Sequence, residues 1–170
     1  MNPNIKFPEG RSWDQVETWS AAEDRFHCIF EDGTEFSLPS PTQVLFTESV
    51  TKIIAQGQAA YNLEVRECQL RAPGGRACAV GMVINDLHYD PDMEATASPR
   101  NFAALPLRRA IASSYPDLNL DPNNHRGSYW RMLTGLQSAH DKADDRDFIH
   151  DFSLLAGEIA LEFNLEMPDV

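Results

Sequence analysis

Apolar residues occupy every second position on both sides of the dipeptide Asp32-Gly33. They are Phe26, Cys28, Phe30, Phe36 and Leu38. A period of two on either side of an Asp-Gly turn is typical of a β-hairpin whose strands each bury one face. The pattern therefore predicts a hairpin over residues 26–38.

The segment before this hairpin carries a helix-start signal. Ser12 is followed three residues later by Gln15, as in a capping box. In that motif the side chain of each residue accepts the backbone N–H of the other. Trp13, Val16 and Trp19 would then share one face. We expect a short helix after Ser12, and a flexible terminus over residues 1–11.

Apolar residues recur at helical spacing in four segments farther along the chain. The first follows Ser40, which is an N-cap residue with Pro41 at the first helical position and Gln43 three residues after the cap. It predicts a helix to about Gln56 or Gly57. The other helices are expected from Leu105 to about Tyr115, from a cap at Ser128 to His140, and from a cap at Asp144 to Phe163. The inner face of the helix after Ser128 would hold Leu136 and His140.

The middle of the chain is less regular. Residues 63–71 predict a strand with Cys68 and Leu70 on one face, and a Pro-Gly-Gly turn follows at 73–75. Residues 77–84 form a short buried element, which we expect to be helical. Residues 85–99 are polar and predict a loop. Together these elements indicate an α+β fold: a mostly helical single domain with an N-terminal β-hairpin and a short second hairpin or strand pair.

The length of 170 residues suits one domain. We expect a globular unit over 12–170, in which 12–39 are an addition to a helical core at 40–165. No apolar run approaches the roughly 18 residues of a membrane span, and the first residues lack the apolar stretch of a signal peptide. Three cysteines are too few for a disulfide framework, so free thiols in the cytoplasm are expected.

A net charge of −12 narrows the range of partners. It disfavours direct binding to nucleic acids and to anionic membranes, since both need Lys and Arg, and it favours a partner protein with a basic surface. Residues 141–170 hold nine acids against Lys142 and Arg146, whereas residues 96–131 hold five arginines against two aspartates. These regions either pair within the fold or provide a docking face.

Several residues have the chemistry of a reactive site. Cys78 follows a glycine turn at a possible helix N-terminus, where His88 or His140 would make it a nucleophile. The pairs His140-Asp141 and His150-Asp151 are candidate metal ligands, although acids near a helix start also serve as caps. Packing, turn and capping roles explain the same residues, so neither a cofactor nor a metal is expected.

The segment GGRACAVGMVINDLHYDPDME (74–94), together with LQSAHD (136–141), resembles a family of small uncharacterised bacterial and bacteriophage proteins. The similarity covers residues 42–165, and Asn85 stands where that family's pattern has a proline. It implies a helical fold around a short hairpin and a mobile-element origin. It implies no activity.

The preferred hypothesis is a non-catalytic, acidic protein that binds a partner protein by occupying its surface. One form of it is an inhibitor encoded by a phage or mobile element, or a DNA mimic. The expected binding residues are Asp86, His88, Tyr89, Asp90, Asp92, Glu94, Asp144, Asp145 and Asp147. The alternative is a small hydrolase that uses Cys78, or a metal held by the His-Asp pairs.

Overall fold

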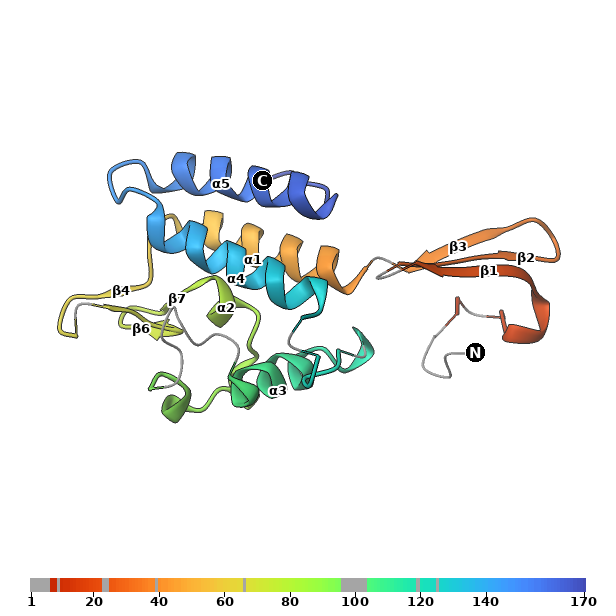
Figure 1. The fold of residues 1–170 in the computed structure, drawn as a ribbon, viewed down its shortest axis with the longest axis horizontal. Coiled ribbons are helices and arrows are strands. Elements are labelled where there is room, and N and C mark those ends of the chain that lie inside the picture. The colour runs from red at the N-terminus through yellow and green to blue at the C-terminus, as the bar shows by residue number, and fades with distance from the viewer. Residues whose placement is uncertain are drawn as a thin grey trace.

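The computed structural model describes residues 7–8, 10–22, 25–38, 40–65, 67–95, 104–118, 120–124 and 126–170. It consists of a small N-terminal sheet and a helical body, and the sheet projects from the end of the body where helix α1 begins (Figure 1). The predicted α+β class is confirmed. Each part has its own cluster of buried apolar residues.

The N-terminal sheet is antiparallel with the order β1-β2-β3. Its strands are β1 (Val16–Ala22), β2 (Arg25–Phe30) and β3 (Glu35–Leu38). The predicted hairpin is β2-β3, and Gly33 closes its turn with an N–H bond of 2.8 Å to the Phe30 carbonyl. Cys28 and Phe30 are buried on one face. Phe7 belongs to the segment expected to be flexible, and it packs on this cluster with its ring centroid 5.4 Å from that of Phe30.

The prediction of a helix after Ser12 is wrong. One 3₁₀ turn, η1 (Trp13–Gln15), is followed directly by β1. Half of the capping box does form, because the Gln15 side chain accepts the Ser12 N–H at 3.1 Å. From Val16 onward the chain pairs with the edge of β2, and this ladder outweighs the local preference for a helix.

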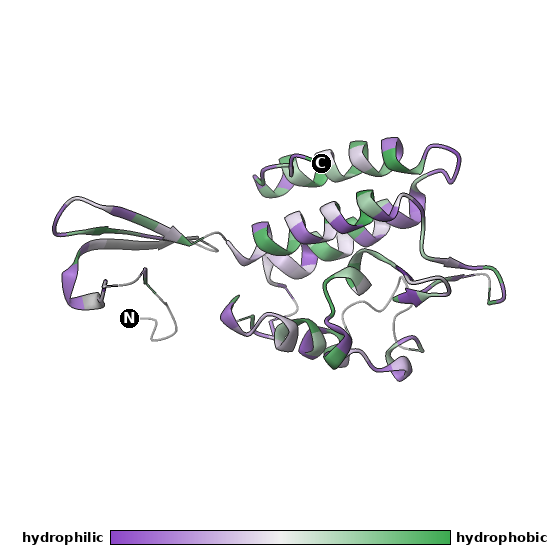
Figure 2. Cartoon of the chain, turned by 180° about the vertical axis from the view of Figure 1, so that it is seen from behind, coloured by the Kyte–Doolittle hydropathy of each residue, from purple (hydrophilic) through white to green (hydrophobic). Residues whose placement is uncertain are grey.

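Three long helices make the main layer of the body. They are α1 (Pro41–Gln56), α4 (Ser128–Lys142) and α5 (Phe148–Phe163), and hydrophobic residues recur along all three (Figure 2). The start of α1 is as predicted, since the Ser40 hydroxyl accepts the Gln43 N–H at 2.9 Å. The inner face predicted for α4, which includes Leu136 and His140, is buried.

The other two helix caps were predicted wrongly. Gly127 and Asp147 occupy the N-cap positions of α4 and α5, and neither gives a side-chain cap. The Asp144 carboxylate instead binds the Arg146 guanidinium at 2.8 Å. The helix begins only at Phe148, and the Asp144 carboxylate also accepts the Arg146 backbone N–H at 2.9 Å in the turn before it.

The single strand predicted over 63–71 is also wrong. β4 (Tyr61–Asn62) pairs with β5 (Glu67–Cys68), and β6 (Arg71–Ala72) pairs with β7 (Arg76–Ala77). The chain turns after β4 because the Asn62 side chain accepts the Glu64 N–H at 2.9 Å. The Pro-Gly-Gly turn lies between β6 and β7, as expected.

Short helical segments complete the body. The preference for helix over residues 77–84 is confirmed for α2 (Ala79–Met82), and α3 (Leu105–Ser114) forms as predicted. Within the expected loop over 85–99, residues 86–88 and 91–93 form the 3₁₀ turns η2 (Asp86–His88) and η3 (Pro91–Met93), and a further turn, η4 (Pro116–Leu118), follows α3. Residues 96–99 lie outside the described residues.

Gly81 provides a test of how closely α2 packs on the chain before β6. A Cβ atom at Gly81 would lie 2.0 Å from the Leu70 carbonyl oxygen, so the backbone itself would have to move. We expect Gly81→Ala to lower the free energy of unfolding by about 2–3 kcal/mol, measured by urea denaturation. Gly157→Ala in α5 is the control, because a Cβ atom placed there would have nothing within 4 Å. It should raise the free energy of unfolding by roughly 0.5–1 kcal/mol. Equal effects of the two substitutions would contradict this packing.

Candidate functional site

Cys68, His140 and Asp141 form the candidate site. Among the described residues, they make a group whose possible ligand atoms all lie within 4.8 Å of one another. Cys68 is on β5, and the other two residues are in the last turn of α4. The sequence separates Cys68 from His140 by 72 residues. A cysteine, a histidine and an aspartate at this spacing raise the question of a catalytic triad or a metal centre.

Hydrogen bonds fix the protonation of the His140 ring. The side chain is fully buried, and its Nε2 atom accepts the backbone N–H of Ala60 at 3.1 Å. Nε2 therefore carries a lone pair, and the single proton of the ring is on Nδ1. Nδ1 lies 3.0 Å from Asp141 Oδ1, to which it donates, and 4.0 Å from Cys68 Sγ.

This arrangement leaves His140 without a basic nitrogen for Cys68. A general base must offer a lone pair to the thiol, but Nε2 is engaged by Ala60 and Nδ1 already carries a proton. Burial and the nearby Asp141 carboxylate both raise the pKa of Cys68 above its usual range, so the thiol keeps its proton near neutral pH.

The same proton opposes a metal at this site. A metal bound to Nδ1 would move the ring proton to Nε2, where it would face the N–H group of Ala60. Two donors would then point at each other in a buried position, which costs more than the lost hydrogen bond alone. Cys68, His140 and Asp141 are residue types that bind zinc. The Ala60 N–H, however, favours the His140 tautomer with its proton on Nδ1, the nitrogen that faces the other two residues.

A network of side chains ties the group to α2. Gln137 donates from Nε2 to Asp141 at 2.7 Å and accepts the Val80 N–H at 3.3 Å. Cys78, the nucleophile of the hydrolase hypothesis, is the N-cap of α2, and its sulfur accepts the Gly81 N–H at 3.4 Å. Burial raises the pKa of Cys78 to about 12. Cys78 is therefore a protonated cap in the core, and the hydrolase hypothesis gains no support from it.

Glu94 holds the acidic segment against the body. Its carboxylate accepts the backbone N–H groups of Leu70 and Arg71 at 2.9 and 2.8 Å. It also accepts the Tyr89 hydroxyl at 2.7 Å, and burial and this carboxylate raise the pKa of Tyr89. Arg71 lies over the Tyr89 ring and pairs with Asp86 at 2.9 Å.

The remaining predicted binding residues of this segment differ in exposure. Asp90 shapes the start of η3, because its Oδ1 atom accepts the Asp92 N–H at 2.9 Å. Asp92 is exposed, and His88 is half-buried at the end of η2. Four of these six residues, Asp86, Tyr89, Asp90 and Glu94, thus have contacts that serve the fold.

The turn between α4 and α5 carries the other predicted binding residues. Asp144, Asp145 and Asp147 are exposed, and Arg146 pairs with Asp144. The two His-Asp pairs lie on opposite sides of this turn with different environments. His140 is buried, whereas His150 is exposed and Asp151 accepts the Asp144 N–H at 3.1 Å.

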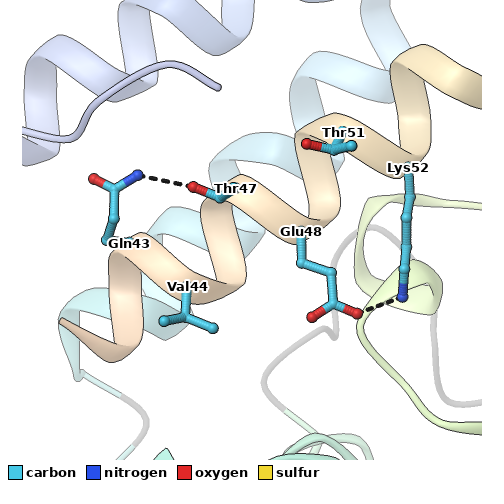
Figure 3. A pocket seen from close by; sticks show the side chains of 6 residues that line it. All are labelled: Gln43, Val44, Thr47, Glu48, Thr51 and Lys52. Carbon is cyan, nitrogen blue, oxygen red and sulfur yellow. Dashed lines mark hydrogen bonds and ion pairs between the residues drawn. The ribbon is translucent and has the colours of Figure 1, made fainter. Parts of the chain in front are cut away.

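A pocket of about 630 Å³ lies along the outer face of α1 (Figure 3). Its lining residues are Gln43, Val44, Thr47, Glu48, Thr51 and Lys52. Several of their polar groups are already bonded within the protein. Gln43 exchanges two hydrogen bonds with the backbone of Glu166, and Lys52 binds Glu48 and the Met82 carbonyl. The candidate reactive residues described above are not among the lining residues.

Sequence reasoning missed the contact of Cys68 with His140 and the exposure of Leu63 and Val65. No local signal marks the first, because the two residues are far apart in the chain. A signal for the second was present. In an alternating segment with Cys68 and Leu70 facing inward, Leu63 and Val65 face the other way.

Comparison of the chain with models of known protein families, with curated proteins and with solved structures found no match. The resemblance to bacterial and bacteriophage proteins therefore stays a prediction. None of the described helices is long and apolar enough to cross a membrane.

Replacing His140 tests its structural role. His140→Ala removes a fully buried ring that packs on Phe148 and leaves the Ala60 N–H without its acceptor. We expect a loss of about 3 kcal/mol in the free energy of unfolding, measured with urea at pH 7. The exposed His150 is the control, and His150→Ala should change stability by less than about 0.5 kcal/mol. A His140→Ala variant as stable as the wild type would refute this role.

The reactivity of the thiols follows from their raised pKa values. Because Cys78 is buried and its pKa is about 12, the thiolate that attacks iodoacetamide is absent near pH 8. We expect Cys78 to remain unlabelled in the native protein while a free cysteine in the same solution reacts completely. Cys68 should react slowly for the same reason. Peptide mass spectrometry gives the measurement, and unfolding in guanidinium is the control that exposes all three cysteines. Rapid native labelling of Cys78 would revive the nucleophile hypothesis.

Proposed function

We propose that this protein is a non-catalytic binding protein that occupies the surface of a basic partner protein. One observation carries the proposal. The exposed turn between α4 and α5, together with the helix ends on either side of it, concentrates negative charge, with five aspartates against one lysine and one arginine over residues 141–151. By contrast, the side chains of His140, Cys78 and Glu94, which could take part in chemistry, each accept a backbone N–H group within the fold.

Electrostatic attraction suits such a surface to a partner rich in Lys and Arg. Complementary charge speeds the encounter and fixes the orientation of two proteins, and it weakens as salt screens it. The finer form of the proposal is an inhibitor, or DNA mimic, that covers the nucleic-acid groove of its partner. A groove that binds phosphates presents the basic surface that these aspartates would match.

Capture at two salt concentrations tests the proposal. Immobilised protein should retain a basic partner from a lysate of the source cells at about 0.05 M salt and release most of it at about 0.5 M. The double variant Asp145→Asn/Asp147→Asn should retain at least about threefold less, whereas Glu158→Gln/Asp169→Asn, which removes two exposed acids elsewhere, should retain the wild-type amount. Equal retention at both salt concentrations, or no retained protein, would count against the proposal.

A further inference from the structure

The loop between β4 and β5 exposes two large apolar side chains. Leu63 is 82% exposed and Val65 is 53% exposed, and Tyr61 at the start of β4 is also exposed. We call residues 63–65 the hairpin tip. A single exposed apolar side chain is ordinary, but two of them on one projecting loop form a compact feature that needs an explanation.

The hairpin tip stands on a rigid base. Asn62 is buried, shapes the turn through the Glu64 N–H and donates to Gln69 at 2.7 Å. The Ala60 carbonyl accepts the Gln69 N–H at 3.0 Å, and the Ala60 N–H binds the buried ring of His140. Because these contacts hold the base of the hairpin in place before any encounter, less entropy is lost when Leu63 and Val65 are bound.

Acids at the end of α4 and in the turn before α5 lie beside this hairpin. Asp141 and Asp145 are close enough to Cys68 on β5 for both to raise the pKa of its thiol. Both views of the chain place the hairpin and the turn at the end of the body opposite the N-terminal sheet (Figures 1 and 2). Glu64 and Glu67 add exposed carboxylates on the hairpin itself. An apolar centre bordered by charged groups is the usual composition of a protein-binding surface.

We propose that the hairpin tip is the central contact for the partner, and that Leu63 and Val65 insert into an apolar pocket bordered by Lys and Arg. This inference rests on the proposed function and names its docking surface. The acids decide the kind of partner. They repel anionic lipids and nucleic-acid phosphates, and they repel a second copy of this acidic chain, so a basic protein is the occupant that the charges favour.

Substitution of Leu63 and Val65 tests the surface. Leu63→Ser/Val65→Ser should reduce the amount of the salt-sensitive partner captured from the lysate at least tenfold. Leu161→Ser is the matched control, because Leu161 on α5 is 85% exposed and lies outside the hairpin, and it should reduce capture less than twofold. Unchanged far-ultraviolet circular dichroism of both variants shows that exposed positions were altered without unfolding.

A photoreactive side chain identifies what the tip touches. We would place the benzophenone amino acid p-benzoylphenylalanine at position 63 and, in a second variant, at position 161, and irradiate each in the lysate. The proposal expects an adduct from position 63 alone, with a protein whose crosslinked peptide contains apolar residues near Lys or Arg.

The possible outcomes separate this inference from the proposed function. An adduct with nucleic acid, with lipid or with a second copy of the chain would overturn the inference, as would an adduct at position 161 only. If the wild type captures a salt-sensitive partner but position 63 forms no adduct, the docking surface is wrong and the proposed function stands. If the wild type captures nothing, both fail.

Discussion

The buried imidazole of His140 connects parts of the chain that would otherwise have little in common. It lies at the end of α4, accepts a backbone hydrogen from Ala60 at the base of the β4-β5 hairpin, and packs its ring against Phe148 at the start of α5. A ring with both nitrogens engaged in a core position leaves no polar atom unpaired, so the cost of burying it is offset. Through Ala60, Phe148 and the neighbouring Asp141-Gln137 pair, this side chain links the hairpin, the start of α5 and α2.

A cysteine, a histidine and an aspartate within hydrogen-bonding range do not by themselves make a reactive centre. The chemistry depends on where the ring proton is, and here a backbone amide decides it. The Ala60 N–H needs an acceptor, which leaves Nδ1 to carry the proton toward Asp141. A main-chain carbonyl in the place of that amide would instead require a proton on Nε2, so a single backbone group decides which ring nitrogen can act as a base.

The sequence predicted the elements that local signals specify. Helix α1 follows from Ser40 and Pro41, and the β2-β3 hairpin follows from alternation around Gly33. It failed where distant partners decide the outcome, as in β1, which becomes a strand because β2 offers it an edge. The candidate site belongs to the second kind. His140 was expected on a buried face, but its contacts with Ala60 and Cys68 depend on how the hairpin folds back on α4.

The two clusters of buried residues have a consequence for how this chain can vary. Among the described residues, the cluster around Cys28 and Phe30 shares no member with the cluster of the helical body. The chain passes from one to the other next to Ser40, whose hydroxyl already completes the first turn of α1. Among the described residues, an exchange of the strands upstream of Ser40 would remove no member of the body's buried cluster. Within the described residues, a change in the side-chain packing of one cluster therefore leaves the members of the other cluster in place.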